Sequence, residues 1–167
     1  MSIVAPEARR TGLLDAALVA LRRPAVITAA FSAYAGAVHV YLAPEHFRAW
    51  WGYGAFFLAV GVLQVLLAVP VARRPGPAVC FAGITGTAAV LAVYVLSRTS
   101  GVPVGPAHSS HRLERAGPLD LTVAAVELVV IVLLVSLLPA RLGRIATNAL
   151  LAAGLGLWAL RLSGLLA

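Results

Sequence analysis

Residues 39–51 read His-Val-Tyr-Leu-Ala-Pro-Glu-His-Phe-Arg-Ala-Trp-Trp and separate the first two long apolar runs of the chain. They include His39, Glu45 and His46, two of the four histidines and one of the six acidic residues. Pro44 is expected to end the preceding helix, because the residue before a proline avoids the helical region. The chain is therefore expected to leave an apolar environment and re-enter it here.

The composition on both sides of this stretch is typical of a membrane protein. Of the 167 residues, 61% are hydrophobic and 11% are charged, and the mean hydropathy is +0.95. Soluble domains are about 45–50% apolar and about 25% charged. A water-soluble domain of this size still exposes much of its surface, so it has no room for this many apolar side chains. We therefore expect lipid to surround several segments.

Five apolar runs are long enough to cross a bilayer, because about 20 helical residues span about 30 Å of hydrocarbon. The sequence predicts an all-α integral membrane bundle of five transmembrane helices within residues 24–167, with spans at about 24–43, 50–69, 78–96, 119–138 and 145–162. Ala33-Tyr34-Ala35 has the form of a signal-peptide cleavage site. The apolar run continues past it, so an uncleaved helix is the preferred interpretation.

Residues 1–23 are expected to form a separate cytoplasmic or interfacial segment. Leu14, Leu18 and Leu21 lie at helical spacing between charged residues. The apolar part is too short to span, so we expect a short amphipathic helix lying in the membrane interface.

All 13 basic residues are arginines, and the net charge is +7. They lie between apolar runs and form no basic stripe with interleaved aromatics, which argues against a nucleic-acid partner. Successive segments between the predicted spans lie on alternate sides of the membrane. This places eight arginines on the side of the N-terminus and five on the other side. The positive-inside rule then predicts a cytoplasmic N-terminus and an outside C-terminus in the cell membrane. The opposite orientation is the alternative.

Glu127 lies well inside the fourth apolar run. An ionisable residue at such a depth costs about 2.5–3.5 kcal/mol on insertion scales, so it normally has a partner and indicates a functional site. His39 is the expected partner, at a similar depth from the same side. The pair is expected to hold a proton, to bind a metal or to orient a ligating imidazole. The alternative is a buried hydrogen bond that fixes two helices together.

The metal hypothesis takes His39, Glu45, His46 and Glu127 as ligands in an outer-side cluster. Imidazole with carboxylate suits zinc, copper or iron, and a haem-like ligand is a further option. His39 and His46 share a face only if the helix continues through Pro44. A role for Glu45 at the start of a short second helix is the structural alternative.

Other polar residues leave further functions open. Gln64 and Asp120 are expected to extend a polar track with the His/Glu cluster, which would suit an oligomeric small-solute or ion transporter. A structural or accessory subunit of a larger membrane complex is another alternative, and it ranks ahead of the transporter. No P-loop or nucleophile-elbow motif is present, so an enzyme is not favoured. Ser32 and Gly36 are expected to pack helices closely within the chain, and Cys80 is expected to be a packing residue.

Residues 97–106, Ser-Arg-Thr-Ser-Gly-Val-Pro-Val-Gly-Pro, and residues 117–121, Gly-Pro-Leu-Asp-Leu, resemble a segment of small multi-pass membrane proteins of high-GC actinobacteria. Residues 39–50 fit the same group, so the resemblance covers about a third of the chain. It implies a five-helix membrane protein and implies no activity.

The polar residues as a whole predict a non-enzymatic membrane protein with a His/Glu binding cluster. Its expected partners are the lipid bilayer and either further copies of itself or a larger membrane complex.

Overall fold

The computed structural model describes residues 6–99, 101, 104–105 and 116–164, and it describes side chains from residue 23 onward. In these ranges the chain forms five helices and no strand, which confirms the all-α class. The helices are α1 (Pro6–Ala49), α2 (Trp51–Arg73), α3 (Pro77–Thr99), α4 (Pro118–Ser136) and α5 (Ala140–Leu162). In length and composition five helical segments are sufficient to cross a membrane, the first of them being Arg23–Ala49.

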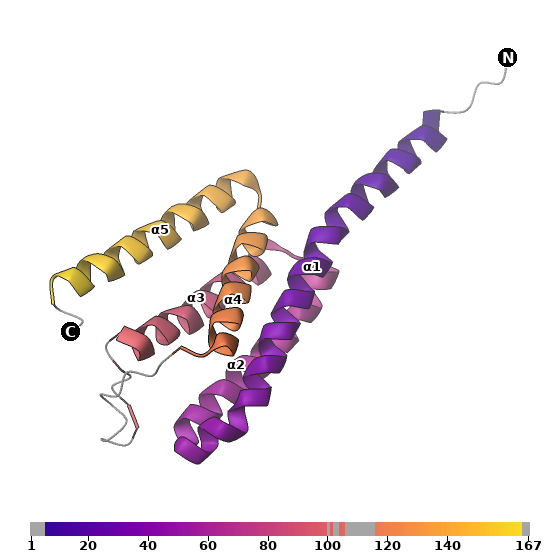
Figure 1. Cartoon of the computed structure of the whole chain (residues 1–167). Coiled ribbons are helices and arrows are strands. Elements are labelled where there is room, and N and C mark those ends of the chain that lie inside the picture. The colour runs from indigo at the N-terminus through magenta and orange to yellow at the C-terminus, as the bar shows by residue number, and fades with distance from the viewer. Residues whose placement is uncertain (1–5, 100, 102–103, 106–115, 165–167) are drawn as a thin grey trace.

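The first helix departs from expectation, because α1 is one continuous helix of 44 residues. The short N-terminal helix predicted within residues 1–23 is not seen as a separate element, and Pro24 and Pro44 both lie inside α1. Each proline removes one backbone hydrogen bond from the helix. In apolar surroundings the neighbouring backbone groups have no partner outside the helix, so they keep their helical hydrogen bonds and the helix continues past the proline. At about 1.5 Å per residue α1 is about 66 Å long, and Figure 1 shows its N-terminal part extending beyond the other helices.

A hairpin of α1 and α2 forms the frame of the molecule. The two helices run antiparallel and are joined through Trp50 alone. Gly36 and Gly61 face each other so closely that a Cβ atom on either would lie 2.6 Å from the other's carbonyl oxygen. The Ser32 hydroxyl donates to the Gln64 backbone carbonyl at 3.0 Å, which confirms that the Ser32/Gly36 pair packs helices within the chain.

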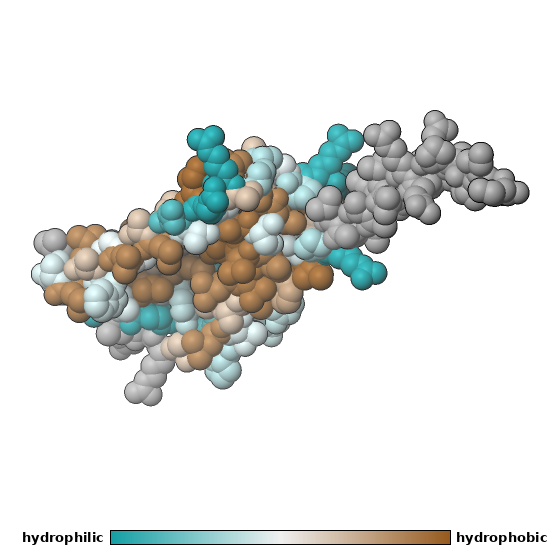
Figure 2. Space-filling view, turned by 90° about the horizontal axis from the view of Figure 1, so that it is seen from above, coloured by the Kyte–Doolittle hydropathy of each residue, from teal (hydrophilic) through white to brown (hydrophobic). Residues whose placement is uncertain are grey.

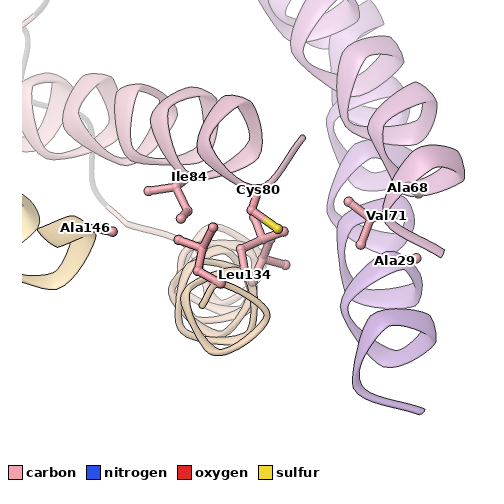
Figure 3. Packing of buried hydrophobic residues seen from close by; sticks show 9 residues of the cluster. Ala29, Ala68, Val71, Cys80, Ile84, Leu134 and Ala146 are labelled. Carbon is pink, nitrogen blue, oxygen red and sulfur yellow. The ribbon is translucent and has the colours of Figure 1, made fainter. Parts of the chain in front are cut away.

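An apolar core closes one end of the bundle, where α1 enters, α2 and α4 end, and α3 and α5 begin. Figure 3 shows Leu134 of α4 beside Cys80 and Ile84 of α3. Val71 of α2 belongs to the same cluster, and Leu134, Val71 and Cys80 have no exposed surface. The prediction of Cys80 as a packing residue is confirmed.

The last helix is attached loosely. In α5, all of which the structure describes, Ala146 is the one buried residue. Residues of α3, α4 and α5 line an apolar groove, and Figure 1 shows the ribbon of α5 set apart from those of α3 and α4 over most of its length. Apolar side chains also cover much of the face seen in Figure 2, which fits helices that contact lipid.

Candidate functional site

A cavity of about 310 Å³ lies at the opposite end of the bundle from the apolar core. It is enclosed by the C-terminal parts of α1 and α3, the N-terminal parts of α2 and α4, and Val104 of the following loop. Most of its lining is apolar or aromatic. Among the residues that the structure describes, the titratable side chains in the lining are those of His39, His46, Tyr53, Tyr94, Arg98, Asp120 and Glu127.

His39 and Glu127 meet at the inner end of this cavity. His39 Nε2 lies 3.7 Å from Glu127 Oε1, and the side chains are only 7% and 2% exposed. Gln64 of α2 completes the cluster, because its Nε2 donates to the same Glu127 oxygen at 3.0 Å. The close Gly36–Gly61 crossing, one helical turn from His39, brings α1 and α2 near enough for both to reach Glu127 of α4.

The hydrogen bond on the far side of the His39 ring fixes its tautomer. His39 Nδ1 lies 2.9 Å from the Ala35 carbonyl oxygen. A carbonyl oxygen only accepts hydrogen bonds, so Nδ1 must carry a hydrogen. In the neutral imidazole the lone pair is then on Nε2, which faces the Glu127 carboxyl group. The contact between the two side chains is favourable only when one proton is held on Nε2 or on the carboxyl group.

His46 shares the cavity but not this cluster. Because α1 continues through Pro44, His46 lies on the same face as His39, two turns and about 10–11 Å away along the axis. Its ring stacks on Phe57 with a centroid distance of 3.6 Å, and Phe57 also lies 5.5 Å from His39. His46 Nδ1 is held by the Leu42 carbonyl oxygen at 2.9 Å. Phe57 therefore forms an apolar contact common to both imidazoles.

An ion pair lies at the helix ends, on the other side of the cavity. Arg98 donates to Asp120 at 3.1 Å, and the two side chains are 18% and 31% exposed. Asp120 also accepts the Gly117 backbone N–H at 2.9 Å, so it caps the N-terminus of α4. Asp120 is seven residues, about 10–11 Å along the axis, from Glu127. It is therefore a cap and ion-pair partner rather than a neighbour of Gln64.

The expected cluster forms only in part. The structure brings together His39, Glu127 and Gln64, whereas Glu45 is exposed on α1 and does not line the cavity. In the described ranges no group of three or more His, Cys, Asp or Glu side chains is arranged to hold a metal ion. The metal-binding prediction thus gains no support. The other two histidines, His108 and His111, lie outside the described residues.

The position predicted for the cluster was wrong for its main pair. His39 and Glu127 were expected at the outer side, but they are buried between helices inside the bundle. Two features of the site were missed by sequence reasoning, the Arg98–Asp120 pair and the Phe57 ring between the histidines. The Arg98–Asp120 pair could have been predicted, because opposite charges lie at the end of α3 and the start of α4. Phe57 carried no signal, since aromatic residues are common in apolar spans.

No protein-family model, curated protein or solved structure matches this chain. The resemblance to small actinobacterial membrane proteins therefore stays a prediction, and the site's own geometry is the basis for function.

Proposed function

We propose that this protein binds and releases one proton at the His39–Glu127 pair in the interior of the membrane. One observation carries the proposal: the Ala35 carbonyl fixes the hydrogen on His39 Nδ1, so the bare Nε2 faces a carboxyl oxygen at 3.7 Å. A proton held on either of these groups leaves the pair neutral overall, either as two neutral groups or as an imidazolium with a carboxylate. Loss of that proton leaves one negative charge beside a lone pair.

Burial gives this proton its importance. Glu127 is 2% exposed, and an ionised carboxylate without a matched partner is expensive in such surroundings. Gln64 supplies one hydrogen bond to the carboxyl group, which moderates the penalty but brings no charge. Proton binding therefore changes the net charge of a site that has little water around it, which is the property that proton-binding sites in membrane proteins use.

Exposure along the cavity supports access from one end. Side-chain exposure falls from 31% at Asp120 to 2% at Glu127 over about two turns of α4. On the opposite side of Glu127 the path ends at the apolar core around Leu134. With the orientation predicted from the arginines, the cavity end faces outward. Full transport across the membrane then requires a second conformation that opens the core end.

A role as a scaffold or accessory subunit is the second candidate, and one observation favours it. The contacts of Glu127 to His39 and Gln64 connect α4 to both helices of the hairpin. Such a role needs a hydrogen-bonded cluster but no exchange of protons with water. The two candidates therefore differ in whether the cluster titrates.

Proton counting tests this difference. The purified protein in lipid nanodiscs is titrated potentiometrically through the range of carboxyl and imidazole groups, and the curve is compared with those of Glu127→Gln and Glu45→Gln. We expect Glu127→Gln to lose a titration step at the pair while circular dichroism shows a folded protein. Glu45→Gln removes an exposed carboxyl at the end of α1 and should leave the step at the pair unchanged. A folded Glu127→Gln protein with the same curve as wild type would contradict proton exchange and favour the scaffold role.

A further inference from the structure

The cavity next to the His39–Glu127 pair has aromatic walls. Trp50, Tyr53, Phe56 and Phe57 come from the start of α2 and the residue before it, and Tyr94 comes from α3. The faces of aromatic rings carry partial negative charge and attract cations. A cation already lies on one of these rings, because the Arg98 guanidinium carbon is 5.0 Å from the Tyr94 centroid. The wall chemistry therefore favours a positively charged or flat apolar occupant.

The inner end of the cavity favours a positively charged occupant over a neutral apolar one. His39 and Glu127 both line the cavity. Once the proton of the pair leaves, His39 Nε2 and the Glu127 carboxylate are both hydrogen-bond acceptors, and Glu127 carries a full negative charge. Both acceptors are satisfied by an occupant that has at least two N–H donors and a positive charge. Neutral molecules leave the charge uncompensated, and anions are repelled by it.

Among the described residues, the other charged groups around the cavity do not offset this charge. Facing Glu127 are His39 and His46 from α1, Tyr53 from α2, Tyr94 and Arg98 from α3, and Asp120 from its own helix. Arg98 and Asp120 form an ion pair at 3.1 Å, so their charges largely cancel. With neutral imidazoles, the described side chains that line the deprotonated cavity have a net charge of one negative unit.

We propose that the cavity binds a small primary organic ammonium ion with an apolar body, and that this ion replaces the proton of the His39–Glu127 pair. The ammonium group donates hydrogen bonds to both His39 Nε2 and the Glu127 carboxylate from the cavity side, and the apolar body lies among the aromatic walls. The displaced proton leaves through the cavity to water, so one positive charge enters as one leaves. This proposal rests on the proton-binding function proposed above.

The volume limits the size of the occupant. A cavity of about 310 Å³ is at the small end of ligand pockets. A single aromatic ring with a short aminoalkyl chain is of suitable size, and a large multi-ring amphiphile is not.

The test uses 2-phenylethylammonium as the probe and 2-phenylethanol as its neutral counterpart. Binding to wild-type protein in nanodiscs is measured by titration calorimetry against empty nanodiscs. We expect saturable binding of one ammonium ion per chain and at least tenfold weaker binding of the alcohol. Glu127→Gln should weaken ammonium binding at least tenfold, whereas the exposed Glu45→Gln should leave it unchanged. Equal affinity for the alcohol, or unchanged affinity in Glu127→Gln, would overturn the proposal.

A second measurement needs no variant. With a pH-sensitive dye in weakly buffered solution, each bound ammonium ion should release up to one proton from wild-type protein. Because one proton competes with one ligand, ammonium affinity should rise about tenfold per pH unit wherever the pair is protonated. If Glu127 titrates but the ammonium ion releases no proton, the cation site is wrong and the proton-binding function stands. If Glu127 does not titrate at all, the proposed function and the exchange both fail.

Discussion

The two ends of the bundle formed by α1 to α4 are built from the same kinds of helix but are packed in opposite ways. At one end, Leu134, Val71 and Cys80 fill the space between helices and have no exposed surface. At the other, the same helices leave a cavity of about 310 Å³ that reaches His39 and Glu127. The difference shows how a small membrane protein can keep a polar site accessible from one side: one end is filled, and the other is held open.

The largest effect is expected where the two ends share a support, at the Gly36–Gly61 crossing. Gly36→Leu places a side chain against the Gly61 carbonyl oxygen, which a Cβ alone would approach to 2.6 Å. We expect the free energy of unfolding to fall by more than about 3 kcal/mol, which is the upper end of the usual cost of overpacking. Unfolding in sodium dodecyl sulfate, followed by circular dichroism, measures it. Gly86→Leu is the matched control, because Gly86 of α3 has open space around it. Similar loss in both variants would contradict a specific crossing.

The second-largest loss of stability is expected in the apolar core at the filled end. Leu134→Ala leaves a cavity between α3 and α4, and we expect the free energy of unfolding to fall by about 2–3 kcal/mol, the lower part of the range for soluble cores. The lower part applies because removal from lipid has no hydrophobic term, so lost packing dominates. Leu128→Ala on the same helix removes a side chain that is 56% exposed and should have little effect. Proton binding at Glu127 should survive in both variants. Its loss in Leu134→Ala would mean that the two ends are not independent.

The smallest effect is expected at the open end. Arg98→Gln breaks the pair with Asp120, whose side chain is 31% exposed. Partly exposed ion pairs contribute up to about 1 kcal/mol, and salt screens them. The stability difference from wild type should therefore shrink in high salt, and the same detergent titration at two salt concentrations measures it. A salt-independent loss would show that Arg98 does not stabilise the protein through this ion pair.

Sequence reasoning predicted the parts of this comparison that depend on depth in an apolar run. Glu127 and His39 were matched because an ionisable residue in a span needs a partner at similar depth, and the structure places them 3.7 Å apart. The continuity of α1 could not be predicted, because the effect of Pro24 and Pro44 depends on what surrounds the backbone. Glu45 was grouped with His39 by its position in the chain. An unbroken helix turns residues six apart to different sides, so Glu45 is exposed.

Nitrogen-15 solid-state NMR of histidine-labelled protein in lipid tests the central claim most directly, with the His39 signals assigned by comparison with His39→Asn. The structure predicts that Nδ1 of His39 carries a hydrogen at every pH, because it donates to the Ala35 carbonyl. Nε2 should sense the arrival of one proton on acidification, and the pH dependence of this response should differ in Glu127→Gln, which has no carboxylate to compensate the charge. A neutral His39 ring with its hydrogen on Nε2 and a bare Nδ1 would contradict the account. In that tautomer Nε2 already carries a hydrogen that faces the Glu127 carboxylate, and the pair needs no added proton.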